Sequence, residues 1–187
     1  MTKLRCAVLD DYQQVALKAA DWSGITDKVE VKVIERHIDQ QDELIEQISD
    51  CEIIVIMRER TPFRASLLAQ LPRLKLLITT GMRNASVDIA AAESQGVTVC
   101  GTGGAGNATA ELTWALLLGL ARNIVQEHNA IRSGQWQSTV GTDLYGKTLG
   151  VLGLGKLGSK IAKFGQAFGM DVVAWSQNLT QERADEV

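Results

Sequence analysis

The feature that most constrains the fold of this sequence is a glycine-rich turn between an apolar strand pattern and a helical one. Residues 148–158 read TLGVLGLGKLG, and the helical pattern continues to residue 169. The spacing G-x-G-x-x-G falls on Gly153, Gly155 and Gly158. In this setting the first glycine allows a sharp turn, the second lets a pyrophosphate approach the backbone, and the third packs the helix on the strand. The segment therefore predicts a dinucleotide-binding βα unit.

The start of the following helix would supply the groups that bind the phosphates. The backbone N–H groups near Lys156 and Leu157 would point at them, and the helix dipole favours negative charge there. A second apolar strand, 171–175, follows at the distance expected for a βαβ unit. The alternative is that the glycines only pack a tight turn between strand and helix.

The end of that second strand bears on the choice of cofactor. In NAD sites, an acidic residue about 20 residues past the glycines binds the ribose 2′-hydroxyl. Here the strand ends in Ser176, Gln177 and Asn178, and Asp171 lies at its other end. A neutral Ser176 would not repel a 2′-phosphate, although no arginine follows at once and Arg183 is distant in sequence. The expected cofactor is NAD or NADP. Two alternatives stay open: a site that is relaxed or leans toward NADP, and a site that is selective for NAD.

Composition excludes several classes of protein. The chain has 187 residues, 45% of them hydrophobic and 22% charged, which is ordinary for a globular protein of one or two domains. A net charge of −3 gives no general attraction to nucleic acid or to an anionic membrane. No segment approaches the roughly 18 apolar residues of a membrane span, and the N-terminus enters a strand pattern instead of a signal peptide. No nucleic acid or membrane partner is expected.

The cysteines and histidines indicate a reducing compartment and no metal site. Cys6, Cys51 and Cys100 are odd in number, widely spaced and set in apolar runs, which is typical of reduced core cysteines. A cytoplasmic location is therefore expected. No clustered His and Cys residues suggest a metal site. His37 and His128 have no evident acidic partner in the sequence, and each is predicted to be a surface histidine.

The first hundred residues predict a small α/β domain, a flavodoxin-like doubly wound parallel sheet. Short apolar runs alternate with amphipathic stretches, which favours parallel strands covered by helices on both faces. Asp39 would cap the second helix and Ser86 the fourth. The expected strands are 4–9, 29–34, 53–57, 74–78 and 97–99, and the expected helices are 15–20, 42–48, 65–71 and 87–95.

A glycine-rich break separates this domain, residues 1–100, from the second, residues 101–187. Four glycines fall within residues 100–106, which favours a flexible crossing or hinge. Asn107 or Thr109 would then cap one long helix that runs to about residue 131. After a polar loop, the glycine-rich unit begins the second domain, an incomplete Rossmann fold.

Four further segments complete a recognisable pattern. They are LKLLITTGMRNASVD at 74–88, AEL at 110–112, GQW at 134–136 and GKTLG at 146–150. In this order, and with the glycine-rich turn, they resemble the D-isomer-specific 2-hydroxyacid dehydrogenase family over nearly the whole chain. The resemblance implies an oxidoreductase that interconverts 2-hydroxy and 2-oxo acids by hydride transfer. It also implies a substrate-binding first domain, a cofactor-binding second domain and a homodimer.

By that resemblance, the loop of Gly81, Met82 and Arg83 offers backbone N–H groups to a substrate carboxylate. The family commonly shows G-x-G-x-D-N-I-D here, whereas this chain has Arg83 at the second glycine and AS in place of the Asp-Asn pair. Gly81 and Asp88 are unchanged. Arg83 would pair with an acidic substrate or a cofactor phosphate, or point into water. The alternative for the whole segment is an ordinary strand-to-helix loop.

Four other residues each have two interpretations. Arg58 and Arg60 follow the third strand, where they would contact substrate or form a solvated charge cluster with Glu59. Thr109 is a helix cap by its position, although the resembling family places cofactor contacts near it. Trp136 is predicted to be a packing anchor rather than a cofactor contact.

The resemblance assigns no catalytic residue to this chain. In the family, a histidine, its carboxylate partner and an arginine perform that role, and all three lie beyond the equivalent of residue 187. Three interpretations follow. The favoured one is a dehydrogenase whose remainder is missing. The others are a non-catalytic dinucleotide-binding regulatory module, and a fragment that oligomerises through its long helix or its open sheet edge.

Overall fold

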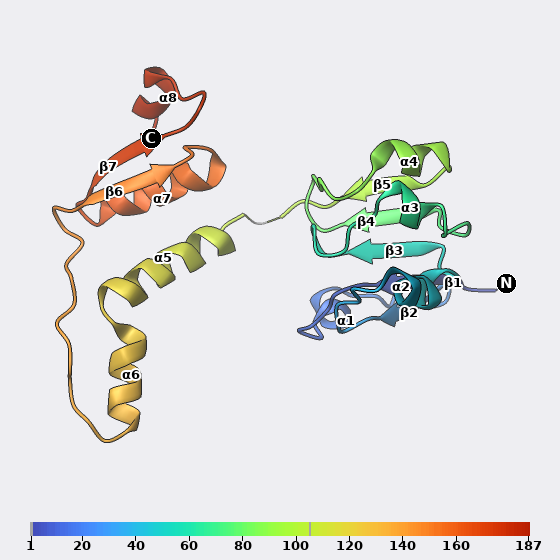
Figure 1. The fold of residues 1–187 in the computed structure, drawn as a ribbon, viewed down its shortest axis with the longest axis horizontal. Helices are drawn as coiled ribbons and strands as arrows, with labels where there is room; N and C mark the ends of the chain where they lie inside the picture. The colour runs from blue at the N-terminus through green and yellow to red at the C-terminus, as the bar shows by residue number, and fades with distance from the viewer. Residues whose placement is uncertain (1, 105) are drawn as a thin grey trace. The chain divides into compact units, whose positions relative to one another are not determined.

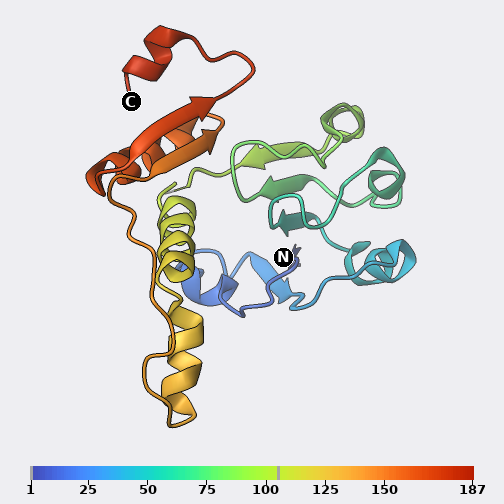
Figure 2. The same ribbon diagram turned by 60° about the vertical axis from the view of Figure 1, so that its left-hand side comes forward.

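A computed structural model describes residues 2–104 and 106–187. The chain forms two compact units, residues 1–104 and 105–187, which are drawn in Figures 1 and 2 and described here one after the other. Within the described residues, every helix falls short of the length and apolar character that crossing a membrane requires.

The first unit is built around a five-stranded parallel sheet in the order β2-β1-β3-β4-β5. This is the strand order of flavodoxin-like doubly wound folds, so the predicted fold class is confirmed. The strands are β1 (Leu4–Val8), β2 (Val29–Val33), β3 (Ile53–Ile56), β4 (Leu76–Thr79) and β5 (Thr98–Gly101). The helices are α1 (Ala16–Ala19), α2 (Gln41–Ile48), α3 (Ala65–Leu68) and α4 (Ile89–Ser94).

One apolar cluster holds this unit together. Ile54 of the central strand β3 lies opposite Ala7 of β1 on one side and Leu77 of β4 on the other, and all three are fully buried. Ile48 of α2 and Leu68 of α3 belong to the same cluster. Burying these side chains fixes the register of the middle strands, because a shift of one residue would turn them to the opposite face.

Two of the three cysteines lie in the core. Cys6 and Cys51 are free and buried, and burial raises the pKa of each thiol to about 11. Cys100 is free but exposed, so the prediction that it is a core cysteine is wrong. The reason is its position on β5, which is an edge strand of the sheet.

Two helix caps differ from the prediction. Residue Gln40, not Asp39, is the N-cap of α2, and it makes no side-chain cap bond. Asp88, not Ser86, caps α4 by accepting a hydrogen bond from the Ala91 amide at 3.0 Å. The Ser86 hydroxyl instead donates to the Asn84 side chain. The capping position is the residue just before the helix, and α2 begins at Gln41 while α4 begins at Ile89, two residues later than expected.

The second unit begins with two helices in place of the single long one predicted. They are α5 (Ala108–Ala121) and α6 (Ile124–Arg132). Asn123 between them has the left-handed conformation, with φ of 52°, and this ends the first helix. Asparagine adopts that conformation more readily than most residues. The side chain of Asn107 makes no cap bond, and it accepts instead from the Lys160 ammonium.

The second unit continues with a βαβ arrangement. The strands β6 (Thr148–Leu152) and β7 (Asp171–Trp175) pair in parallel, and α7 (Lys156–Ala167) lies along one face of the pair (Figures 1 and 2). Gly165 allows close packing, because a Cβ there would lie 2.6 Å from Leu149 Cδ2. A short helix, α8 (Gln181–Asp185), follows β7. This is the first half-unit of a Rossmann fold, as predicted.

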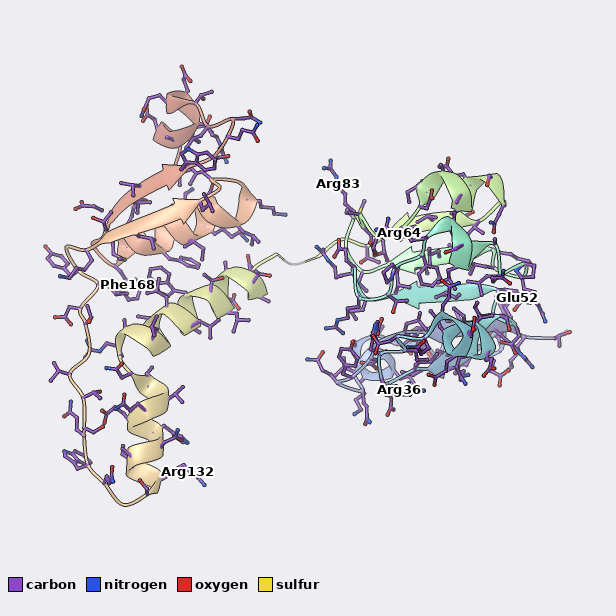
Figure 3. All side chains as sticks on the ribbon, viewed as in Figure 1. Arg36, Glu52, Arg64, Arg83, Arg132 and Phe168 are labelled. Carbon is purple, nitrogen blue, oxygen red and sulfur yellow. The ribbon has the colours of Figure 1, made fainter. Side chains whose placement is uncertain are left out.

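An aromatic cluster joins α5 to α7 within this unit. The Trp114 ring on α5 makes edge-to-face contacts with Phe164, at 5.8 Å between ring centres, and with Phe168, at 4.9 Å. Phe168 is labelled in Figure 3. Trp136, predicted to be the packing anchor, is 82% exposed, so that prediction is wrong. The polar loop that carries Trp136 belongs to no helix or strand that would bury the ring.

The two tryptophans provide a matched test of this packing. Replacing Trp114 by alanine removes a buried aromatic ring, and we expect the free energy of unfolding to fall by about 3–5 kcal/mol. The matched Trp136→Ala change should alter it by less than about 0.5 kcal/mol, since an exposed side chain loses little on truncation. Urea denaturation followed by circular dichroism measures both. Equal losses in the two variants would contradict the assignment of Trp114 as the anchor.

Candidate functional site

The backbone of the glycine-rich turn explains why two of its glycines are needed. Gly153 has φ of +95°, a conformation that favours glycine. Its N–H donates to the Trp175 carbonyl at 2.7 Å, which places the turn beside the end of β7. A Cβ on Gly158 would lie 1.9 Å from the Gly153 carbonyl oxygen, so no side chain fits there. The first and third glycines thus have the steric roles expected from the sequence.

The second glycine leaves an open space at the start of α7. Gly155 is the N-cap residue, and a Cβ built on it would meet nothing within 4 Å. The backbone N–H groups of Lys156 and Leu157 donate no hydrogen bond to any residue that the structure describes. Unpaired amides at the N-terminus of a twelve-residue helix, beside a position without a side chain, suit a pyrophosphate.

The residues after β7 lie next to this turn. Ser176 is half-buried, and its carbonyl accepts from the Leu179 amide at 3.1 Å, which turns the chain back toward α8. Gln177 and Asn178 are exposed. Arg183 of α8 is distant from the glycine-rich turn in the sequence. In the structure, its Nη2 donates to the Ser159 hydroxyl in the first turn of α7 at 3.3 Å. A cation therefore stands beside the helix that would bind phosphates.

Thr109, the remaining predicted cofactor residue, lies in the first turn of α5. Its side chain is exposed, and its carbonyl accepts a hydrogen bond from the Thr113 hydroxyl at 2.7 Å. It is not the N-cap, which is Asn107.

The predicted substrate loop in the first unit follows β4 at the carboxyl end of the sheet. Gly81 has φ of +105°, and its N–H donates to the Thr102 hydroxyl at 3.0 Å, so this amide is not free for a carboxylate. The amides of Met82 and Arg83 donate no hydrogen bond within the described residues. Met82 is 71% exposed, and Figure 3 shows the Arg83 side chain projecting outward. The predicted anion cradle therefore contains two available amides rather than three.

Neighbouring segments brace this loop. Asn84 donates from its side-chain amide to the Arg58 carbonyl at 2.6 Å and to the Thr79 hydroxyl at 2.9 Å. A Cβ on Gly101 would lie 2.8 Å from the Gly81 carbonyl oxygen and from Met82 Cα, so the end of β5 must be glycine here. A hollow of about 430 Å³ is lined in part by Met82, Asn84 and Gly101. Sequence analysis had not singled out Asn84 as a site residue.

The two predicted arginines diverge. Arg58, with φ of 54°, lies against Gly81, since a Cβ on that glycine would meet Arg58 Nη1 at 2.3 Å. Arg60 turns toward β1 instead. Its Nη1 donates to the Asp10 carbonyl at 2.9 Å, and its guanidinium carbon lies 4.7 Å from the centre of the Tyr12 ring. The structure thus joins Arg58 with the substrate loop and joins Arg60 with the end of β1.

His37 has an acidic partner, contrary to the prediction. Its Nδ1 lies 2.8 Å from Asp10 Oδ1, and its Nε2 lies 3.3 Å from Asp39 Oδ1. Asp10 is only 1% exposed, and its other carboxylate oxygen accepts from the Thr61 hydroxyl at 2.7 Å. Sequence reasoning missed this cluster, although two consecutive aspartates directly after an apolar strand were a signal. His128 is exposed on α6.

The second of those aspartates has a local role. The amides of Ala16 and Val15 donate to the Asp11 carboxylate at 2.9 and 3.1 Å, and they hold the pKa of that carboxyl below its usual range. Asp11 therefore stabilises the start of α1. In the part of the chain that the structure describes, no group of three His, Cys, Asp or Glu side chains could hold a metal ion.

Comparison with known proteins bears on both units. The family described as D-isomer specific 2-hydroxyacid dehydrogenase, NAD binding domain, matches residues 114–187. The D-3-phosphoglycerate dehydrogenase of Methanocaldococcus jannaschii is 33% identical over 150 residues, which are 79% of this chain and 28% of that protein. The glyoxylate reductase of Aeropyrum pernix is 37% identical over 131 residues, 65% of this chain and 39% of that protein. A solved phosphoglycerate oxidoreductase from Vibrio cholerae O395 is 36% identical, with a TM-score of 0.89 over 98% of this chain and 59% of its own.

The chain belongs to the D-isomer-specific 2-hydroxyacid dehydrogenase family. This confirms the resemblance inferred from the sequence. It also confirms that the cofactor is a nicotinamide dinucleotide. The chain spans 28% and 39% of the length of the two dehydrogenase relatives named above and 59% of the solved chain. Its own activity, substrate and partners are therefore proposals.

Gly155 allows the cofactor assignment to be tested without disturbing the fold. Since nothing lies within 4 Å of a Cβ at this position, Gly155→Val should fold and yet place its side chain where a pyrophosphate would sit. We expect NADH affinity, measured by the quenching of tryptophan fluorescence, to fall by at least about a hundredfold, or roughly 2.7 kcal/mol. Gly150→Ala in β6, which also has open space, is the matched control and should bind normally. Undiminished binding by Gly155→Val would refute the assignment.

Proposed function

We propose that this chain is the substrate-binding unit and the first cofactor-binding unit of an NAD(P)-dependent dehydrogenase that interconverts small 2-hydroxy and 2-oxo acids. In this proposal, residues 1–100 bind substrate, and residues 101–187 supply the hinge, the helices α5 and α6 and the cofactor's phosphate site. The observation that carries the proposal is the open glycine-rich turn at the N-terminus of α7, in a chain whose relatives are 2-hydroxyacid dehydrogenases.

The residues of this chain would bind and orient the reactants. The amides of Lys156 and Leu157 hold the pyrophosphate, while Met82 and Arg83 offer their amides to the substrate carboxylate. Arg58 adds a positive charge beside that loop. The bound nicotinamide supplies or accepts the hydride. No described residue is assigned as the proton donor, because the resemblance places that group beyond residue 187.

The cofactor choice proposed here is relaxed or leans toward NADP. Two observations support it. Ser176 at the end of β7 is neutral and half-buried, and the Arg183 guanidinium of α8 donates to the Ser159 hydroxyl in the first turn of α7. A phosphate monoester paired with an arginine forms charge-assisted hydrogen bonds, which are among the stronger polar contacts.

Cofactor selectivity is tested by titrating the chain with NADH and with NADPH. We expect Arg183→Ala to weaken NADPH binding about tenfold, the loss of one charge-assisted contact, and to leave NADH binding within about twofold. Arg132→Ala at the end of α6 is the control, since that arginine is exposed and far along the chain from α7. If the unchanged chain binds NADH at least tenfold more tightly than NADPH, the leaning toward NADP is wrong.

Substrate binding is tested with glyoxylate by following backbone amide resonances. We expect glyoxylate to shift the backbone amide resonances of Met82 and Arg83. We expect Arg58→Ala to weaken glyoxylate binding by about tenfold, because it removes a hydrogen bond between charged groups. Lys28→Ala, an exposed cation at the opposite end of the sheet, should bind normally. Shifts spread evenly over the surface, with no loss in Arg58→Ala, would leave the loop without its proposed role.

We also propose that two copies associate through the second unit. An apolar set on α5 and α6 is exposed, including Leu116, Leu120, Ile124 and Val125, and a contiguous exposed apolar surface of this kind is typical of an interface. This is the homodimer that the resemblance implied. A cytoplasmic location remains a prediction that rests on the free cysteines.

A non-catalytic, dinucleotide-binding regulatory module is the alternative function. It is supported by the same open turn on α7, which would bind a dinucleotide in either case. The titrations above separate the two, since such a module would bind cofactor and show no glyoxylate shifts at Met82 and Arg83.

A further inference from the structure

We propose that Asp10 is a positioning residue: with Thr61 and His37, it holds the guanidinium of Arg60 in place at the substrate-binding edge of the first unit. This rests on the proposed function, which assigns small anionic substrates to that edge. It adds a role for two residues, Asp10 and His37, that the sequence had not connected with any site.

The contacts around Asp10 fix its backbone and its side chain. It lies just past β1, is 1% exposed, and has φ of 59° although it is not glycine. Non-glycine residues in this conformation persist where neighbouring contacts determine them. Here both carboxylate oxygens and the carbonyl oxygen have partners, which are His37, Thr61 and Arg60 respectively.

The left-handed turn at Asp10 determines the direction of its carbonyl group. The carbonyl accepts from Arg60 Nη1 at 2.9 Å, while the carboxylate points into the unit toward the Thr61 hydroxyl at 2.7 Å. Asp10 therefore contacts two neighbouring residues of the segment after β3 at once. Holding Thr61 holds the backbone of that segment, and accepting from Arg60 holds its side chain.

Arg60 retains donors for a ligand. The Tyr12 ring supports its guanidinium from one side at 4.7 Å, and Asp10 occupies one terminal nitrogen. Within the described residues, Nε and Nη2 of Arg60 donate no hydrogen bond. An exposed arginine fixed at two points loses less conformational entropy on binding an anion than a free one does.

His37 anchors the other side of Asp10. A carboxylate only accepts hydrogen bonds, so His37 Nδ1 is the donor in the 2.8 Å contact with Asp10. Its second nitrogen faces Asp39 at 3.3 Å. Because β2, β1 and β3 are neighbours in a parallel sheet, their carboxyl ends bring His37, Asp10 and Arg60 together from three separate segments.

The test compares glyoxylate binding by variants of the 187-residue chain, measured by amide resonance shifts. Arg60→Ala should bind about tenfold more weakly, as for any lost charged hydrogen bond. Asp10→Asn keeps a side chain that tolerates the left-handed conformation, and Thr61→Val keeps the volume while removing the hydroxyl; each should bind about three- to tenfold more weakly. Thr61→Ser restores the hydroxyl and should bind within about twofold of the unchanged chain.

A second measurement reports on Arg60 directly. The NMR order parameter of Arg60 Nε should be high in the unchanged chain, like that of a fixed side chain, and should fall in Asp10→Asn and Thr61→Val while the backbone spectrum is retained. Arg83 is the internal reference, because it is exposed and its side chain donates no hydrogen bond within the described residues. A merely structural role for Asp10 would change stability without mobilising Arg60 selectively.

The outcomes separate this proposal from the proposed function. If Arg60→Ala binds glyoxylate normally, Arg60 has no part in substrate binding and this inference fails, whereas the proposed function, which assigns the carboxylate to the Met82 and Arg83 amides beside Arg58, stands. If Arg60→Ala is weak but Asp10→Asn and Thr61→Val bind normally, the proposed function stands and the positioning role of Asp10 is overturned. If both of those variants unfold, the unchanged chain still provides a test. An order parameter for Arg60 Nε as low as that of Arg83 Nε would overturn the positioning role of Asp10.

Discussion

Parallel strand pairing is the constraint on which both candidate sites depend. In a parallel sheet every strand ends at the same edge, so loops that are far apart in sequence meet there. In the first unit this edge collects Asp10, His37, Arg60 and the loop at Gly81. In the second, pairing of β6 with β7 places Ser176 beside Gly153. The apolar registers that fix the strands therefore also fix the polar groups at their ends.

Close backbone contacts set the shape of these edges. The Gly153 carbonyl occupies the space that a side chain on Gly158 would need, and Gly101 leaves room for the loop at Gly81. Each contact joins a strand end to the backbone of another segment. Because interiors are densely packed, even one added methyl group at such a point would shift the loop. The glycines thus serve the geometry of the sites as much as the flexibility of the chain.

Much of the fold followed from local patterns, and the exceptions have clear causes. Apolar runs and turn residues predicted every strand of the first unit and the βαβ of the second. The break at Asn123 was missed because a single left-handed residue leaves the apolar periodicity of α5 and α6 nearly unchanged. Trp136 was misjudged because burial depends on which elements surround a ring. Trp114, on a helix that packs on α7, is the buried one.

By itself, the sequence determined the class of fold, the family and the glycine-rich turn, because each of these depends on short motifs and on their order along the chain. Only the tertiary structure decided which polar groups meet. Asp10 lies 27 residues from His37 and 51 from Thr61, and Arg183 lies 24 from Ser159. No local pattern encodes such distances. These contacts form because burial of apolar side chains fixes the sheet registers and the helix positions. The polar groups at the strand ends and helix termini then lie next to one another.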